Sequence, residues 1–370
     1  MRIESLTFLR FFAAFVVVVY HHGKGTALAD WARPLMVSGP QMVTFFFVLS
    51  GFVLMISQHG REGQPWRRFY LARLARIAPV YWFAIPFAYL ANRWSQDISP
   101  GEVLLHASFL QSWVPAHVYK LNIPAWSVSV EAFFYLVFPV LAFGLRNVRV
   151  RSLLLMAAGL WALTQVGLTM ALANGLYDRQ DVLWRSAFQY LPINHLCSFV
   201  LGIAGGRAFV LRKSLEPKRG LLPLLACLVA CAAIFWVLRY KWYIKSLVGM
   251  ELPFAVSLMA PLFLALIWTL ARSNNPLTRL LSLKPLVLLG EASYSLYILQ
   301  NPVIYGFRRF VYPYLDSSKE AKFYVYLVGL VLISIASLYL IERPGRRVVL
   351  WAASFLPRLA RPARSYGSGD

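Results

Sequence analysis

The chain has 370 residues, of which 59% are hydrophobic and only 14% are charged. This composition is too apolar for an ordinary soluble domain, so we expect the chain to lie in a lipid bilayer. The formal net charge is +22, but the basic residues are dispersed between apolar stretches rather than gathered in one patch. That distribution indicates membrane topology signals and argues against nucleic acid as a partner.

The sequence lacks the motifs that mark several common kinds of chemistry. We find no Walker-type phosphate loop, nucleophile elbow, dinucleotide fingerprint or metal-ligand cluster, so we expect no ATP hydrolysis, no metal and no bound cofactor. The three cysteines, Cys197, Cys227 and Cys231, fall in apolar stretches and are interpreted as packing residues. The N-terminus does not resemble a cleavable signal peptide, because Arg10 interrupts its apolar region.

The expected fold is an all-α integral membrane protein, a bundle of about ten transmembrane helices. A span needs about 20 mostly apolar residues. Basic residues are more frequent in the connections on the side of the N-terminus, so the positive-inside rule predicts that both termini are cytoplasmic. The predicted spans are residues 5–22, 38–58, 74–93, 124–145, 152–173, 190–210, 221–239, 251–271, 285–305 and 321–342.

Outside these spans, we expect no soluble domain at either end. We predict one membrane-embedded domain over residues 3–345 and a basic cytoplasmic tail over residues 346–370, whose end is disordered. The long connection at residues 94–123 contains an apolar run too short to span, so we expect it to lie at the interface or to re-enter and form part of a lid.

The first span carries Arg10 and His21, eleven residues apart. In a helix they would be separated by about 16 Å along the axis and would lie on nearly the same face. Because an ionisable group in hydrocarbon is costly unless it faces a cavity or a partner, both are candidate functional residues. Alternatively, Arg10 reaches the cytoplasmic headgroups and His21 marks the opposite interface.

The third and fourth spans add further polar groups. Arg73 and Arg76 are three residues apart and share a helix face, where they could bind a phosphate-bearing ligand, although positive-inside anchoring explains some of these arginines. Ser127, Glu131 and Tyr135 share one face of the fourth span. Glu131 needs a cation, a donor or a proton, which Arg10 or His21 could supply; the alternative is a structural salt bridge between helices.

Two spans are marked by small residues and one by hydroxyl groups. The glycine in FFFVLSGFVL, Gly51, and the glycines around Gly202 favour close helix packing. Tyr294 and Tyr297 begin a polar face of the ninth span, which indicates either a wet cavity or hydrogen bonds between helices.

The chain resembles the acyltransferase 3 family of multi-span membrane O-acyltransferases, which includes O-antigen and exopolysaccharide O-acetyltransferases. The resemblance covers residues 3–345, and its motifs occur in the family's order. They are Arg10 with ten residues before His21, then FFFVLSGFVL, RLARIAPVYW, WSVSVEAFFYLVFP and SYSLYILQNP.

The resemblance implies an acyl-CoA co-substrate, most often acetyl-CoA, and transfer to a carbohydrate hydroxyl such as that of a surface polysaccharide or its lipid-linked precursor. It also implies a bacterial inner-membrane location and marks Arg10 and His21 as the essential pair. Gln300 stands where many relatives have a histidine, so any role of that histidine is absent. No fused hydrolase-like domain accompanies the motifs, so we expect the stand-alone form.

These observations lead to a mechanistic hypothesis in which His21 is the general base, or an acyl relay, and Glu131 orients it. Arg10 would attract the donor or stabilise the oxyanion, and Arg73 and Arg76 would hold the nucleotide phosphates. The remaining candidate substrate-binding residues are Trp126, Ser127 and Tyr294. Two other classes compete: a transporter of a lipid-linked sugar or acidic solute, and a structural subunit of a polysaccharide export assembly.

Overall fold

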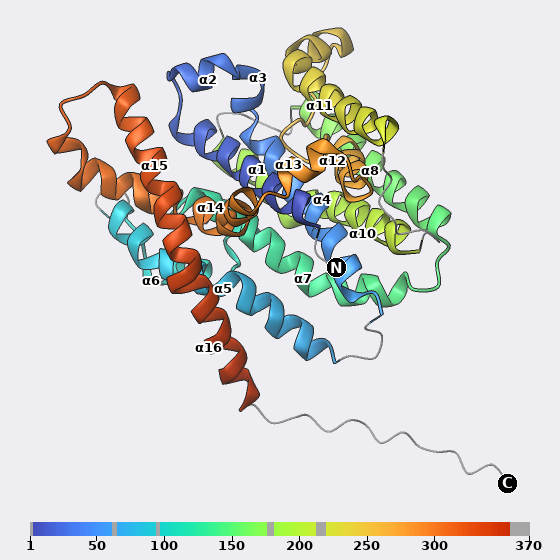
Figure 1. The fold of residues 1–370 in the computed structure, drawn as a ribbon, viewed down its shortest axis with the longest axis horizontal. Coiled ribbons are helices and arrows are strands. Elements are labelled where there is room, and N and C mark those ends of the chain that lie inside the picture. Colours follow the sequence, from blue (N-terminus) through green and yellow to red (C-terminus); the bar gives the residue numbers. More distant parts are fainter. Residues whose placement is uncertain (1–2, 61–64, 94–96, 176–180, 212–219, 356–370) are drawn as a thin grey trace.

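The computed structural model describes residues 3–60, 65–93, 97–175, 181–211 and 220–355, which contain helices and no strand. Figure 1 shows a bundle of long helices with one helical rod, α15 followed by α16, along its edge. The predicted all-α class is confirmed. The helices are α1 (Glu4–His22), α2 (Ala27–Trp31), α3 (Arg33–Met36), α4 (Gly39–Gln58), α5 (Trp66–Asn92), α6 (Pro100–Ala107), α7 (Trp126–Gly144), α8 (Val150–Ala173), α9 (Val182–Tyr190), α10 (Leu196–Val210), α11 (Leu221–Val248), α12 (Ala260–Ala271), α13 (Pro276–Leu281), α14 (Lys284–Phe310), α15 (Lys319–Ser337) and α16 (Arg343–Ser354).

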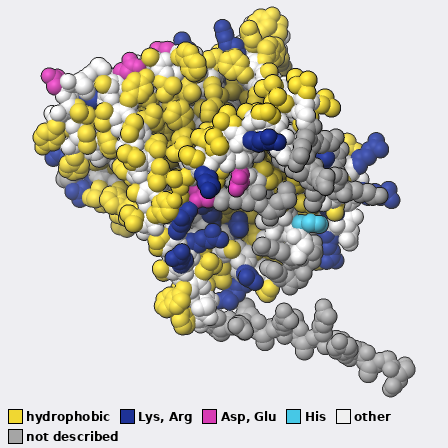
Figure 2. Space-filling model, viewed as in Figure 1, with side chains coloured by type: hydrophobic (Ala, Val, Ile, Leu, Met, Phe, Trp, Pro, Cys, Tyr) yellow, Lys and Arg dark blue, Asp and Glu magenta, His cyan; other side chains and the backbone are white. Residues whose placement is uncertain are grey.

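Eight helical stretches among the described residues are long and apolar enough to cross a membrane. They contain α1, α4, α5, α7, α8, α9 with α10, α11, and α15 with α16. Figure 2 shows that hydrophobic side chains cover most of the visible face, as a lipid-facing surface requires. These observations define an integral membrane protein.

The other two predicted spans differ from the expectation. Residues 285–305 do lie within the 27-residue helix α14, but α14 is not among the stretches apolar enough to span. The span predicted at 251–271 is helical only from Ala260, so α12 has 12 residues and would be about 18 Å long. Pro253 and the left-handed backbone of Ser257, whose φ is 62°, account for the turns that replace its first half.

Close packing of α4 against α10 forms one half of the interior. A Cβ atom added at Gly51 would meet the backbone of Phe199, and one added at Gly202 would meet the backbone of Val48. The two helices are therefore in direct backbone contact, which only glycine permits. The structure confirms that these glycines serve helix packing.

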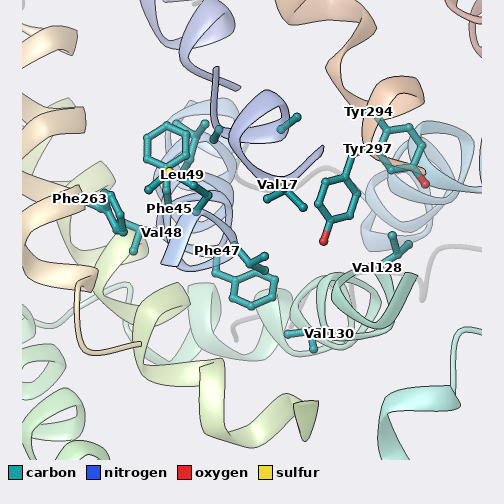
Figure 3. Close-up of a cluster of buried hydrophobic side chains, with 14 of the residues drawn as sticks. Val17, Phe45, Phe47, Val48, Leu49, Val128, Val130, Phe263, Tyr294 and Tyr297 are labelled. Atoms are coloured by element: carbon teal, nitrogen blue, oxygen red, sulfur yellow. The ribbon is translucent and has the colours of Figure 1, made fainter. Parts of the chain in front are cut away.

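The first helix, α1, forms the centre of the other half, because it packs against both α4 and α14. A Cβ atom added at Gly290 of α14 would meet the backbone of Thr7, so these helices also approach closely. Val17 of α1 and Tyr297 of α14 belong to the same buried cluster, with Val128 of α7 (Figure 3). The stretch of α1 from Ala13 to Val19 is thus largely buried.

The connection between α5 and α7 folds against the end of the bundle opposite to the N-terminus. The Tyr81 hydroxyl of α5 donates to the backbone carbonyl of His106, and the Gln111 amide donates to the Ala125 carbonyl. Burial raises the pKa of the Glu102 carboxyl, but hydrogen bonds from Ser99 and His117 outweigh it and lower that pKa to about 2. The connection contains α6 and three short 3₁₀ turns, none of them long enough to span.

The predicted basic tail at residues 346–370 begins inside a helix. Residues as far as Ser354 belong to α16, and the Arg67 guanidinium of α5 donates to the carbonyl of Ala353 at 3.0 Å. The rest of the predicted tail, from residue 356, lies outside the described residues.

We expect Gly202→Ala to lower the midpoint of thermal unfolding, because the new methyl group would be forced against the Val48 carbonyl oxygen. Overpacking of this kind costs about 1 to 3 kcal/mol. Gly159→Ala in α8 is the matched control, since a Cβ there has nothing within 4 Å. Thermal scans of both variants in one detergent would test the expectation, and equal midpoints would contradict the close contact of α4 with α10.

Candidate functional site

A cavity of about 210 Å³ lies inside the bundle between α1, α4, α5, α7 and α14. We call it the central cavity. It brings together six of the eight site residues predicted from sequence, which come from four different helices. The six are Arg10, Arg73, Arg76, Ser127, Glu131 and Tyr294.

More arginines line the central cavity than form ion pairs with described carboxylates. Arg10 interacts electrostatically with Glu131 and Glu342, but it forms no ion pair or hydrogen bond with any described residue. Arg73 also lacks an ion pair within the described chain, and its buried Nε atom has no hydrogen-bond partner. Buried guanidinium groups of this kind favour an anionic ligand.

Arg76 differs from its neighbours because it has a carboxylate partner. It forms an ion pair with Glu342, whose side chain is 5% exposed. Glu342 also lies 3.4 Å from the Ser295 hydroxyl, and it ends a π-helical turn, η6 (Leu338–Glu342), that joins α15 to α16. Interruptions of this kind are frequent at functional sites.

Sequence reasoning missed Glu342. The available signal was an acidic residue at the end of an otherwise apolar span, in the segment IERP. An acid in that position needs a cation, yet nothing in the spacing identifies Arg76, which is 266 residues away.

A second cavity of about 600 Å³ shares Arg10, Arg73 and Arg76 with the central cavity. We call it the mouth cavity, because it is also lined by Ile3 at the start of the described chain and by Arg346 of α16. The view in Figure 2 shows basic side chains gathered beside the α16 rod. The central cavity therefore adjoins a cavity at the end of the bundle where the described chain begins.

Hydroxyl groups line the central cavity on the sides of α7 and α14. The Ser127 hydroxyl lies 3.0 Å from the Tyr297 hydroxyl, and the Tyr294 hydroxyl donates to the carbonyl of Ile77 at 2.7 Å. Figure 3 shows the Tyr297 hydroxyl directed towards α7. These groups can donate or accept hydrogen bonds from a ligand that reaches them.

His21 is not among the residues that line the central cavity. It is half-buried at the last turn of α1, its ring contacts those of Tyr20 and His22, and it has no hydrogen bond to any described side chain. Because α1 is unbroken, His21 lies about 16 Å from Arg10 along the axis.

The expected pairing of Glu131 with His21 is not present in the structure. Glu131 instead accepts a hydrogen bond from the Tyr135 hydroxyl, one turn along the same helix, and faces the cavity that contains Arg10. The carboxylate is therefore placed to balance the charge of Arg10 rather than to orient the imidazole.

Trp126 also lies outside the lining of the central cavity. Its ring packs against Tyr190 and His195, with centroids 4.7 Å and 5.3 Å away. His195 is buried, and its Nε2 atom is 2.9 Å from the carbonyl of Gln189. Both residues therefore join the 3₁₀ turn before α10 to the start of α7.

The helices long enough to span a membrane, together with a cavity between them that three arginines line, define an integral membrane protein with a charged interior site. The particular family follows from comparison with known proteins. Residues 3–343 match the model of an acyltransferase domain, so the chain belongs to the acyltransferase 3 family.

Several curated proteins are similar to this chain. Acyltransferase MdmB of Streptomyces mycarofaciens is 30% identical, over 83% of this chain and 80% of its own. The exopolysaccharide production protein ExoZ of Rhizobium meliloti is 29% identical, over 83% of this chain and 89% of its own. O-acetyltransferase OatA of Staphylococcus aureus is 24% identical over 96% of this chain, which spans only 59% of that relative. No solved structure matches the chain.

We expect Glu342→Gln to destabilise the protein, because it would leave the charged Arg76, whose side chain is only 26% exposed, without its carboxylate. Loss of one partner of a buried ion pair costs about 3 to 5 kcal/mol in soluble proteins. The double variant Arg76→Gln/Glu342→Gln should recover most of that loss. Thermal unfolding of the single and double variants measures the coupling between the two residues.

The matched control is Glu291→Gln, which removes the carboxylate from the more exposed pair with Arg343. Exposed pairs contribute about 0 to 1 kcal/mol, so the control should unfold close to the wild type. A double variant no more stable than Glu342→Gln would show that Arg76 does not depend on this carboxylate.

Proposed function

We propose that this acyltransferase moves an acyl group, most often acetyl, from acyl-CoA to a hydroxyl group of a carbohydrate. The observation that carries the proposal is the pair of arginines, Arg10 and Arg73, that have no ion-pair partner among the described residues and that line both the central cavity and the mouth cavity. Acyl-CoA acts as a co-substrate rather than a bound cofactor, and no metal takes part in the proposed chemistry.

The charge balance of the mouth cavity supports an anionic donor. Five arginines and two glutamates line it, and two of the arginines are paired, Arg76 with Glu342 and Arg343 with Glu291. Arg10, Arg73 and Arg346 remain without an ion-pair partner among the described residues. Arginine binds phosphate groups with two parallel hydrogen bonds, so these three suit the diphosphate of a nucleotide-linked thioester.

The thioester of such a donor would extend from the mouth cavity into the central cavity. There the hydroxyls of Ser127, Tyr294 and Tyr297 offer hydrogen bonds to its carbonyl or amide groups. Arg10 is available to attract the pantetheine or phosphate end of the donor, because it lies about 16 Å from His21 along α1 and does not reach a carbonyl attacked beside the imidazole. Glu131 keeps this arginine in place by its charge.

In the proposed reaction, His21 removes the proton from the acceptor hydroxyl as its oxygen attacks the thioester carbonyl carbon. The carbon–oxygen bond forms, the carbon–sulfur bond breaks, and the thiolate takes the proton from the imidazolium. His21 lies one turn beyond Val17, which belongs to the buried cluster of Tyr297, so an acceptor would reach it from the end of the bundle opposite to the mouth cavity. A relay in which His21 carries the acyl group fits the same placement.

The acceptor and the membrane are inferred from the relatives. One relative is named for exopolysaccharide production and another as an O-acetyltransferase, and this supports a carbohydrate hydroxyl as the acceptor. The relatives are bacterial, so we place the chain in the bacterial inner membrane. The basic residues around the mouth cavity favour a cytoplasmic position for that end and for both termini.

We expect His21→Ala to lower acyl transfer at least 100-fold, because a general base contributes about 10² to 10⁴ to the rate. The assay follows label from radioactive acetyl-CoA into cell-surface glycans in membrane vesicles. His22→Ala is the matched control at the neighbouring position, whose ring packs on Tyr326 instead, and it should retain transfer at equal membrane abundance.

Transfer by His21→Ala at the wild-type rate would overturn the proposed role of the imidazole. Absence of transfer by the wild type, from succinyl-CoA as well as acetyl-CoA, would instead favour the transporter that the sequence left as an alternative.

A further inference from the structure

Three tyrosines from separate parts of the chain meet at the end of the bundle where α1 ends. Tyr20 belongs to the last turn of α1, Tyr119 to the connection between α5 and α7, and Tyr190 is the last residue of α9. The Tyr119 hydroxyl donates to the Tyr190 hydroxyl at 2.9 Å, and their ring centres are 5.3 Å apart. The Tyr20 hydroxyl interacts electrostatically with both of the others. We call these three residues the tyrosine cluster.

The tyrosine cluster adjoins the histidine that we propose as the general base. The ring centres of Tyr20 and His21 are 5.3 Å apart. Tyr20 is 42% exposed, and its hydroxyl forms no hydrogen bond with any described residue. A ligand that packs on the Tyr20 ring would therefore bring its polar groups beside the imidazole.

Aromatic contacts also connect the tyrosine cluster to the central cavity. The Tyr190 ring packs on Trp126 with centres 4.7 Å apart, and Trp126 meets the ring of Phe47 edge to face at 5.9 Å. Phe47 lines the central cavity. Trp126, which the sequence places among the substrate-binding candidates, therefore supports Tyr190 on the side of the central cavity.

Anchoring at a membrane interface does not account for this arrangement. Tyrosines that mark an interface place their rings among the lipid headgroups. In the tyrosine cluster, segments that are distant in sequence place their rings against one another, and two of the hydroxyls are hydrogen-bonded to each other. An aromatic surface with hydroxyl groups at its edge suits a ligand ring that has an apolar face and a polar rim. A pyranose is such a ring, because its C–H groups form the face and its hydroxyls form the rim.

We propose that the tyrosine cluster binds a pyranose ring of the carbohydrate acceptor. The C–H face of the sugar packs on Tyr20, its rim is hydrogen-bonded by the Tyr119 and Tyr190 hydroxyls, and one sugar hydroxyl is directed at His21. The proposal rests on the carbohydrate acceptor proposed above and names the residues that hold it. It places the acceptor at the end of the bundle opposite to the mouth cavity, where the donor enters.

The test measures sugar binding without any acyl donor, by saturation-transfer NMR titrations of the full chain in lipid nanodiscs. The probes are the methyl pyranosides of glucose, galactose and N-acetylglucosamine. Saturation should pass from the wild type to the ring C–H protons of at least one probe. Tyr20→Leu, which removes the aromatic ring, and Tyr119→Phe, which removes one hydroxyl, should each raise the dissociation constant about fivefold.

Two variants serve as controls. Tyr20→Phe keeps the ring and should bind the probe within about twofold of the wild type, because the packing surface is unchanged. Tyr314→Leu removes a tyrosine that is 87% exposed and lies outside the tyrosine cluster, so it should bind as the wild type does.

The proposal is overturned if the wild type passes saturation to none of the three pyranosides, or if Tyr20→Leu binds them as tightly as the wild type. Equal loss of binding in Tyr20→Phe and Tyr20→Leu would also contradict packing on the ring. Failure of the proposed acyl donor gives a different result: pyranosides bind to the tyrosine cluster as expected, while wild-type vesicles transfer no label from acyl-CoA. That result would support the acceptor site and contradict the donor.

Discussion

The need to compensate buried positive charge determines how this bundle is arranged. Arg76 can lie between membrane-spanning helices because the last span brings Glu342 against it. That contact joins residues from the third and the last of the predicted spans. Arg10 and Arg73 lie beside this pair without an ion pair to any described residue, and Glu131, which lines the same polar cavity, balances the charge of Arg10.

Glycine contacts make the cavity possible by bringing other helices close together. The backbones of α4 and α10 touch at Gly51 and Gly202, and those of α1 and α14 touch at Gly290. Each of α1, α4 and α14 takes part in one of these contacts and also carries residues that line the cavity. Tight packing in these pairs leaves space at the junction of the helices, where the charged and hydroxyl side chains gather.

Local sequence patterns were sufficient for most of the spans and for the polar faces of individual helices. Hydropathy identified the apolar helices, and helical periodicity placed Ser127 and Glu131 on one face. The ninth predicted span lies in α14, which is not apolar enough to count as a span because it carries polar residues that line the cavity. The eighth predicted span is shorter than expected because Pro253 and Ser257 replace its first half by turns. Hydropathy alone cannot anticipate a helix whose polar face is covered by neighbouring helices.

Pairings between distant residues could not be predicted from local sequence patterns. The sequence offered Arg10 or His21 as the cation for Glu131 and left Arg73 and Arg76 as separate candidates, and the structure gathers the three arginines and Glu131 around one cavity. It gives Arg76 a partner that no spacing indicates and gives Glu131 a tyrosine instead of His21. Such pairings depend on how helices pack, which is a property of the whole fold.

The central claim is that the donor enters at the arginine-lined end and that its acyl group reaches the stretch of α1 between Arg10 and His21. The most direct test is an experimental structure of the full chain with a non-transferable thioether analogue of acetyl-CoA. The account predicts the diphosphate at Arg73 and the acyl group beyond Ser127, on the side of His21. An analogue bound with its acyl group in the mouth cavity, on the side of Arg346, would contradict it.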